Sequence, residues 1–255
     1  MNDQFLTELQ NVMGGSGIFM EEPMKKHTTF RVGGPADVLV QPDETALVAI
    51  LALCRQYHVS YSFIGNGSNL LVGDKGIRGV VIEMTDPMGN IEVQGTRITA
   101  QAGAMLSKIA NTAASNGLGG MEFAAGIPGS MGGAVTMNAG AYGGEMKDVI
   151  RQVTVLTQEC ELKVLSREEL DLSYRHSCIP KNHFLVLEAE LSLTPAPEQE
   201  IRAKMAELRE KRVEKQPLEY PSAGSTFKRP EGYSGNDCSN SGGRRCCNGR
   251  SCTGA

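Results

Sequence analysis

Glycine is concentrated in one long run of this chain, GLGGMEFAAGIPGSMGGAVTMNAGAYGGE at residues 117–145. Glycine reaches backbone conformations that other residues avoid, and such runs often form tight turns at phosphate or cofactor sites. Its centre, which we call the second glycine segment (residues 125–135, AGIPGSMGGAV), contains Pro128, a residue that favours the start of a helix. We therefore predict a helix over residues 129–137 whose first backbone amides are free to bind an anion.

A shorter motif, which we call the first glycine loop (residues 65–72, GNGSNLLV), follows a predicted strand at residues 60–64. Gly65 and Gly67 let the backbone turn so that amides converge on an anion, and Ser68 adds a side-chain donor. Two such sites about 60 residues apart, on different lobes, suit a diphosphate-containing cofactor held in a cleft. The alternative interpretation is two glycine-rich structural turns.

Neither segment has the GxGxxG pattern with its later acidic residue, or the GxxxxGK[ST] pattern, so a doubly wound domain is disfavoured. Periodicity instead predicts two lobes, residues 18–85 and 86–195, after an N-terminal helix. The predicted elements are a helix at 2–13, a strand at 38–40, a helix capped by Asp43, strands at 60–64 and 79–84, a hairpin of 91–94 with 97–101, a helix ending at Gly117, a hairpin of 149–157 with 161–165, and a strand at 184–193. TPAP at 194–197 predicts a linker before a charged, solvated surface helix at 198–215.

Composition narrows the function classes. The chain has 255 residues, 40% of them hydrophobic, which supports a core and excludes full-length disorder. A net charge of −4 gives no sign of the basic surface that nucleic-acid binding needs. The N-terminus lacks a secretory signal, and the longest apolar run, Ala46 to Cys54, is too short for a membrane span. We expect a cytoplasmic protein with neither a nucleic-acid nor a membrane partner.

Five motifs carry a family resemblance: TTFRVGGPAD (28–37), GNGSNLLV, GMEFAAGIPGSMGGAVTMNAGAYGGE (120–145), SYRHS (173–177) and PSAGSTFKRPEGY (221–233). In this order and spacing the chain resembles UDP-N-acetylenolpyruvoylglucosamine reductases, which make UDP-N-acetylmuramate for bacterial peptidoglycan. The resemblance runs from about residue 18 to Tyr233 and is to the shorter type, without a lid insertion.

The resemblance implies an α+β fold: a two-lobed FAD-binding domain of the vanillyl-alcohol-oxidase (PCMH) kind plus a truncated α+β substrate-binding domain. The expected divisions are 1–17 (N-terminal helix), 18–85 and 86–195 (FAD-binding lobes), 198–233 (partial substrate-binding domain) and 234–255 (aberrant or disordered tail).

The implied reaction uses a non-covalent FAD, NADPH as co-substrate and a small-molecule sugar nucleotide substrate. Such chemistry needs a cation on the substrate carboxylate, a proton donor at the neighbouring carbon and basic groups for the diphosphate. Arg175 matches the family's catalytic arginine and Ser225 its proton-donating serine. Implied substrate-binding residues are Tyr174, Lys215 and Arg229. Implied cofactor-binding residues are Gly65, Asn66, Gly67, Ser68, Asn69, Leu70, Gly126, Ile127, Pro128, Gly129, Ser130, Gly133, Ala134, Asn138 and Gly140.

Other interpretations of these residues stay open. Without the resemblance, Arg175 fits a surface ion pair and Ser225 an ordinary turn residue. His27 is interpreted as a loop histidine rather than a covalent flavin attachment, and no histidine has the spacing of a metal site. Alternative functions are another FAD-dependent oxidase of the same fold and a catalytically impaired FAD-binding remnant. We expect a monomer without a bound metal.

After Tyr233 the resemblance ends, and the last residues crowd together Cys238, Cys246, Cys247 and Cys252. The interpretation favoured by composition is a frameshifted or truncated product that lacks the family's late glutamate. A metal-binding tail is disfavoured because zinc sites usually pair cysteines as CxxC, and a disordered tail is the third interpretation.

Overall fold

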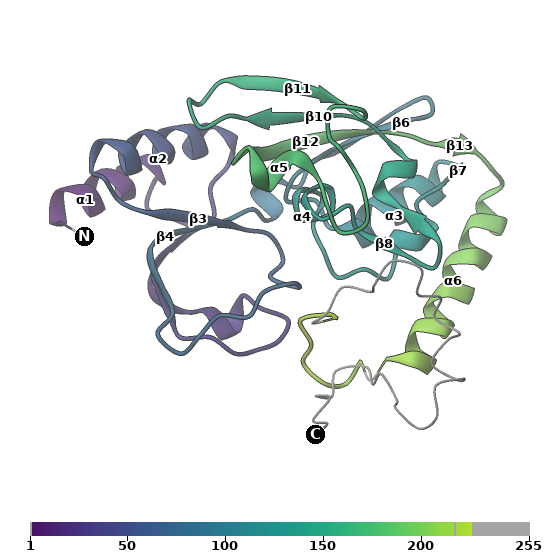
Figure 1. Ribbon diagram of the computed structural model, residues 1–255, viewed down its shortest axis with the longest axis horizontal. Coiled ribbons are helices and arrows are strands. Elements are labelled where there is room, and N and C mark those ends of the chain that lie inside the picture. The colour runs from purple at the N-terminus through teal and green to yellow at the C-terminus, as the bar shows by residue number, and fades with distance from the viewer. Residues whose placement is uncertain (1, 217, 226–255) are drawn as a thin grey trace.

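The computed structural model describes residues 2–216 and 218–225, and its two main sheets lie side by side (Figure 1). The first sheet has four strands in the order β1-β2-β4-β3. Their bounds are Ile18–Pro23 for β1, Pro35–Val40 for β2, Tyr61–Ile64 for β3 and Ile77–Glu83 for β4. Strands β2, β4 and β3 are parallel, and β1 is antiparallel to β2. The strands predicted at 38–40, 60–64 and 79–84 are confirmed as β2, β3 and β4, with ends shifted by one to three residues.

Two helices pack together beside this sheet: α1 (Asp3–Val12) and α2 (Glu44–Gln56). The predicted cap of α2 is confirmed, because the Asp43 carboxylate accepts a hydrogen bond from the Ala46 amide at 2.8 Å. The predicted apolar face of α2 is buried through Leu47, Ile50, Leu51 and Cys54. The helical spacing of the apolar residues therefore predicted this helix and its buried face correctly.

The second sheet is antiparallel and has five strands in the order β11-β10-β12-β6-β5. Their bounds are Ile91–Gln94 for β5, Arg97–Gln101 for β6, Ile150–Leu156 for β10, Leu162–Ser166 for β11 and Leu185–Ser192 for β12. The hairpin of β5 and β6 has the predicted ends and turns at Gly95, whose φ of +61° needs a residue tolerant of the left-handed region.

Helices and short strands surround this second sheet. The helices are α3 (Leu106–Ser115), α4 (Met131–Thr136), α5 (Cys178–Lys181) and α6 (Glu198–Lys215), with 3-10 turns η1 (Met24–Lys26), η2 (Asp86–Met88), η3 (Glu122–Ala124) and η4 (Met146–Asp148). The short strands are β7 (Leu118–Gly119), β8 (Gly140–Ala141), β9 (Gly144–Glu145) and β13 (Thr194–Pro195). Gly117 ends α3 as predicted, with φ +65°.

Two predictions at the end of this lobe need correction. Residues 194–197 are not only a linker, because β13 pairs with β7. Helix α6 has the predicted bounds, but it is not simply a solvated surface helix. It packs on η3 and β7 and buries Ile201 and Leu208, because its narrow apolar stripe has a partner in the second lobe.

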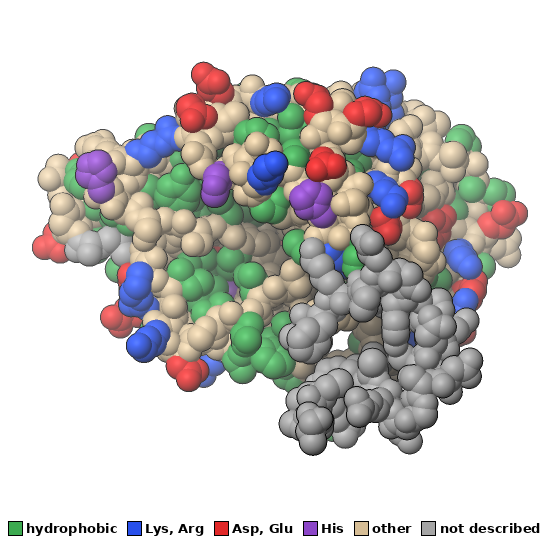
Figure 2. Space-filling view, in the orientation of Figure 1, with side chains coloured by type: hydrophobic (Ala, Val, Ile, Leu, Met, Phe, Trp, Pro, Cys, Tyr) green, Lys and Arg blue, Asp and Glu red, His purple; other side chains and the backbone are tan. Residues whose placement is uncertain are grey.

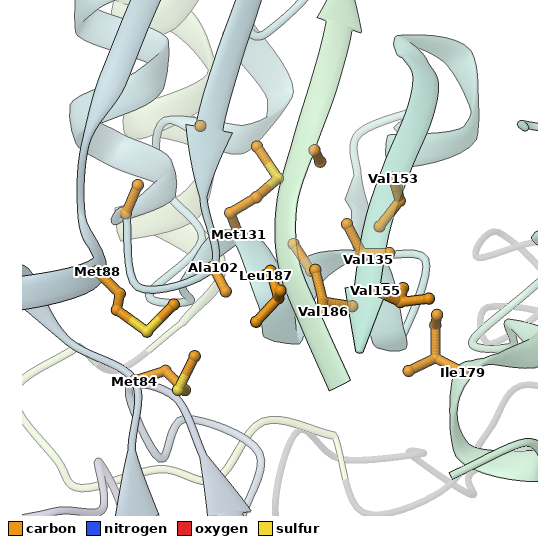
Figure 3. Packing of buried hydrophobic residues seen from close by; sticks show 14 of the residues in the cluster. Met84, Met88, Ala102, Met131, Val135, Val153, Val155, Ile179, Val186 and Leu187 are labelled. Atoms are coloured by element: carbon orange, nitrogen blue, oxygen red, sulfur yellow. The ribbon is translucent and has the colours of Figure 1, made fainter. Parts of the chain in front are cut away.

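One large apolar cluster connects the two sheets. Met84 and Met88, from the connection between the lobes, belong to the same cluster as Met131 and Val135 of α4 (Figure 3), and α4 packs on β12. Most of α4 belongs to the second glycine segment. Because Met131, Ala134 and Val135 of α4 are buried in this shared core, the core fixes the position of that segment. On the face shown in Figure 2, acidic and basic side chains are interspersed. No helix within the described ranges is both long and apolar enough to cross a bilayer.

Candidate functional site

The two glycine-rich segments meet in space, although they come from different sheets. The Asn66 side-chain amide donates a hydrogen bond to the Pro128 carbonyl at 3.0 Å. A Cβ built on Gly65 would lie only 2.3 Å from the hydroxyl oxygen of Ser130, so glycine is required for this contact. The structure therefore joins the predicted anion-binding residues of both lobes into one site.

The first glycine loop leaves its backbone amides available. Gly67 has φ +58°, and a Cβ there would lie 1.9 Å from the His27 carbonyl oxygen. Among residues 2–216 and 218–225, no acceptor takes a hydrogen bond from the amides of residues 65–70. Successive amides without internal acceptors form the kind of concavity that binds phosphate oxygens.

The second glycine segment behaves differently, and its predicted helix needs correction. Helix α4 begins at Met131 rather than at residue 129, and Ser130 is its N-cap. The amides of Met131 and Gly132 are not free, because they donate to the carbonyls of Ala104 and Ala102 at 2.8 and 2.9 Å. Packing in the interlobe core places the start of α4 against the turn at residues 102–104. The carbonyls of that turn accept hydrogen bonds from amides that would have no partner in an isolated helix.

Ser130 shows that the site fits a phosphate-bearing cofactor. The residue is 2% exposed, and within the described ranges its hydroxyl oxygen has no hydrogen-bond partner. A buried hydroxyl without a partner is costly, so the arrangement is explained if a ligand oxygen supplies that partner. The diphosphate of FAD offers such oxygens, and Ser130 with the amides of the first glycine loop would hold it.

The other predicted cofactor-binding residues differ in their contacts and in how exposed they are. A Cβ on Gly129 would lie 3.9 Å from the Ser68 hydroxyl, so these residues also face one another across the two segments. Gly126 and Gly133 are exposed, and Ala134 is buried. The remaining positions are Asn69, which is exposed, and Leu70, Ile127 and Gly140, which are partly buried. Asn138 has a buried side-chain amide that already bonds to Glu145, Ser173 and Lys147.

Arg175 lies in a tight turn whose ends, Ser173 and His176, exchange backbone hydrogen bonds. Its guanidinium donates to the carbonyls of Gly140 at 3.0 Å and Asn138 at 3.4 Å. Tyr174 is 45% exposed, and the guanidinium lies 5.4 Å from the centre of its ring. This arrangement is not the surface ion pair considered from the sequence. The guanidinium has five N–H groups, so most of its donors stay available for a carboxylate.

The segment that carries Ser225 reaches the first lobe. The Thr29 hydroxyl donates to the Ser222 carbonyl, and the Ser222 amide donates to the Thr29 carbonyl at 3.2 Å. Ser225 is exposed and, among the described residues, does not hydrogen-bond to Arg175. Lys215 is the exposed last residue of α6. Arg229 and the four tail cysteines lie outside the described residues, as does the predicted strand beyond Ser225.

Arg212 was missed by the sequence analysis, which read α6 only as charged. A Cβ on Gly126 would lie 3.3 Å from Cδ and 3.9 Å from Nη1 of Arg212, so this side chain borders the second glycine segment. Burial lowers the pKa of Arg212, and none of the described residues forms an ion pair with it. A partly buried guanidinium without a carboxylate partner is suited to a ligand anion.

His27 lies behind the first glycine loop. Its Nδ1 is 3.0 Å from both carboxylate oxygens of Glu83, and its Nε2 is 3.2 Å from Glu22. Both ring nitrogens are thus engaged by carboxylates, which is more than the ordinary loop position expected from the sequence. Among residues 2–216 and 218–225, no three histidine, cysteine or acidic side chains form a group that could hold a metal ion.

Comparison with known proteins defines the class. The protein-family model described as "FAD binding domain" matches residues 35–166 of this chain, which include both glycine segments. UDP-N-acetylenolpyruvylglucosamine reductase from Thermus caldophilus superposes with a TM-score of 0.72 and 36% identity, over 86% of this chain and 76% of that one. A cholesterol oxidase from Brevibacterium sterolicum shares the fold alone, with a TM-score of 0.55, 13% identity, and coverage of 70% of this chain and 38% of its own. The chain is an FAD-binding protein with the expected α+β fold of the PCMH kind.

Relatives define the family within that class. The UDP-N-acetylenolpyruvoylglucosamine reductases of Agathobacter rectalis and of Clostridium botulinum (strain Okra) are 54% and 51% identical to this chain. The matches cover 91% and 90% of this chain and 78% and 75% of those proteins. The chain belongs to the UDP-N-acetylenolpyruvoylglucosamine reductase family. The expected resemblance, FAD cofactor and oxidoreductase class are confirmed.

Proposed function

We propose that this chain reduces the enolpyruvyl group of UDP-N-acetylglucosamine enolpyruvate with NADPH and releases UDP-N-acetylmuramate, a peptidoglycan precursor. The observation that carries the proposal is the buried Ser130 hydroxyl, which lacks a partner within the described ranges and faces the first glycine loop. It marks a place for a phosphate oxygen between the two lobes, at the start of α4, whereas the turn that presents Arg175 is bonded to the other end of that helix.

The residues divide the chemistry among them. The two glycine segments would hold FAD, which when bound would supply hydride transfer from NADPH to one carbon of the enolpyruvyl double bond. Arg175 binds the substrate carboxylate and stabilises the negative charge that develops there. Ser225 gives a proton to the neighbouring carbon and regains one from water, so that the double bond gains one hydride and one proton.

Basic side chains hold the sugar nucleotide. Lys215 ends α6, and Arg212 lies three residues earlier on the same helix, so both are on one helical face. Together with Arg229 they would bind diphosphate oxygens, and Tyr174 would line the pocket. Cofactor binding falls to the residues of the two glycine segments identified from the sequence.

The wider organisation that we propose is the one expected from the sequence. Lobes 18–85 and 86–195 hold the cofactor, residues 198–233 contribute to substrate binding, and residues 1–17 and 234–255 flank them. The chain acts as a monomer in the cytoplasm.

An anaerobic absorption titration of the full chain with bound FAD tests this function. NADPH is added first and the enolpyruvyl sugar nucleotide second, with Arg175→Met as the matched variant. We expect NADPH to bleach the flavin absorbance in both proteins and the substrate to restore it rapidly only in the unmodified chain. The variant should restore it at least about 10²-fold more slowly, since it lacks the charge that stabilises the developing anion.

Each other outcome has a meaning. Absorbance that stays bleached in the unmodified chain would identify a catalytically impaired FAD-binding protein. Reoxidation by oxygen but not by the enolpyruvyl substrate would identify an oxidase of the same fold. Equal rates for the unmodified chain and Arg175→Met would remove Arg175 from its proposed role.

A further inference from the structure

The turn that presents Arg175 is attached at both ends to the end of α4. The Ser173 carbonyl accepts a hydrogen bond from the Asn138 side-chain amide at 2.9 Å. Four residues later the Ser177 hydroxyl donates to the Thr136 carbonyl at 2.7 Å. The turn and the second glycine segment, from which α4 is built, therefore form one unit despite their separation in sequence.

Asn138 is the centre of this unit. The residue is 1% exposed, and its Nδ2 also donates to a Glu145 carboxylate oxygen at 2.9 Å. Its Oδ1 accepts the Lys147 amide at 2.9 Å. Both Nδ2 hydrogens and the carbonyl oxygen are thus used within the protein. The backbone of Asn138 has φ +40°, in the left-handed region that asparagine tolerates better than most residues.

The guanidinium of Arg175 is held by the same short stretch. The carbonyls of Asn138 and Gly140 accept its hydrogen bonds, at 3.4 and 3.0 Å. Arg175 itself has φ +55°, which an arginine adopts only where neighbouring contacts impose it. Both the backbone of the turn and the direction of its side chain depend on how residues 138–140 are placed.

We propose that Asn138 is a positioning residue for Arg175 rather than a ligand of the cofactor. This inference rests on the proposed function for the role of Arg175. The side chain of Asn138 has no donor left for FAD, and its bond to Ser173 holds the turn. Its loss would displace the guanidinium from the substrate carboxylate while NADPH still reduces the cofactor.

The test uses Asn138→Gly in the full chain with bound FAD. Glycine accepts φ +40° without strain and keeps the backbone carbonyl, so this change removes the buried side chain with its hydrogen bonds and leaves the backbone contacts to Arg175 in place. We expect the rate of flavin reduction by NADPH to change less than twofold and the rate of reoxidation by the enolpyruvyl substrate to fall about 10²-fold. Asn138→Asp keeps the shape but replaces the Nδ2 donors with a carboxylate oxygen that repels Glu145 and the Ser173 carbonyl, and should show the same split if the glycine variant fails to fold.

A second readout does not depend on turnover. Trypsin cleaves after arginine, so a released turn should be cut after Arg175 at least tenfold faster, as measured by the mass of the fragments. Tyr57→Phe is the control: it removes one hydrogen bond, to Glu8 at 2.6 Å, between α1 and the end of α2, and should change neither readout.

The two arms separate the inference from the proposed function. If the unmodified chain is not reoxidised by the enolpyruvyl substrate, the proposed function fails, and the cleavage rate alone decides the positioning role. Unchanged cleavage after Arg175 in both Asn138 variants overturns the inference. Loss of FAD with equal slowing of both half-reactions also overturns it, because Asn138 would then act through the cofactor.

Discussion

In the first glycine loop glycine frees backbone amides, whereas in the second glycine segment it lets a short helix pack closely on its neighbours. Gly67 lies against the His27 carbonyl, and the amides around it have no acceptor among the described residues. In the second segment a Cβ on Gly132 would lie 3.0 Å from the Cβ of Ala102, and the first amides of α4 are already bonded. Two glycine-rich segments thus differ as anion-binding sites. The first offers backbone amide donors, whereas the second depends on the side chains of Ser130 and Arg212.

Gly67→Ala should have the largest effect because it breaks the first half of this comparison. The added Cβ meets the His27 carbonyl oxygen at 1.9 Å, and alanine at φ +58° is strained. We expect the free energy of unfolding to fall by roughly 3 kcal/mol and FAD to be lost during purification. Thermal unfolding and the flavin absorbance of the purified chain measure both effects.

Gly73→Ala is the matched control for that change. It lies just beyond the same loop, its φ is not in the left-handed region, and nothing lies within 4 Å of its added Cβ. The FAD content and stability of this variant should stay at the level of the unmodified chain. Equal losses in both variants would mean that the loop tolerates no substitution at all, and the specific role of Gly67 would be rejected.

Arg212→Met tests whether the guanidinium of this α6 residue binds a ligand anion beside the second glycine segment. Methionine keeps an apolar stem over Gly126 and removes the guanidinium, so the protein without ligand should be no less stable. Hydrogen bonds to charged groups contribute about 1.5–3 kcal/mol, so the Kd of the anionic ligand should rise about ten- to hundredfold. Titrations with FAD and with the sugar nucleotide show which diphosphate Arg212 binds, and two unchanged Kd values would exclude both.

Ser130→Ala should have a smaller effect. It should leave the FAD-free protein no less stable, whereas it should weaken the binding of FAD. The hydroxyl has no partner within the described ranges, so its removal should leave the FAD-free protein equally stable or about 1 kcal/mol more stable. Loss of one bond to a phosphate oxygen should raise the Kd for FAD about tenfold. A destabilised FAD-free variant with unchanged affinity would show that the hydroxyl serves the fold instead.

The sequence predicted most of the regular structure and only part of the site. The β5–β6 hairpin and the capped helix α2 were predicted well because their signals, a glycine turn and an aspartate cap, act on adjacent residues. The meeting of the two glycine segments was expected from the need to hold one cofactor between two lobes. Which amides stay free to bind an anion was not predictable. The first amides of α4 are bonded to the carbonyls of Ala102 and Ala104, which reach them only when the chain folds back on α4.

Residues with partners far away in the sequence are hard to assign from the sequence for the same reason. The prediction that Asn138 binds the cofactor rests on its place after a glycine-rich helix, and that place gives no sign of Ser173, which lies 35 positions away. Arg212 was assigned to a solvated helix, since nothing near it in sequence indicates Gly126. Local patterns specify elements, whereas the hydrogen bonds that direct a catalytic side chain depend on contacts that only the folded chain creates.

Gly133→Ala should have the smallest effect and sharpens the comparison most. Gly133 lies in α4 and is exposed, and its added Cβ would be 3.8 Å from the Ser130 hydroxyl, an ordinary contact. Alanine favours helix, so the FAD-free protein should gain about 0.5–1 kcal/mol of stability, measured by chemical denaturation. Its neighbour Gly132→Ala should instead lose stability, because that Cβ presses on Ala102.

If FAD lies over the second segment, the methyl group on residue 133 occupies its space, and the Kd for FAD should rise although the fold is more stable. An unchanged Kd would mean that this segment packs the core and leaves cofactor binding to the first glycine loop.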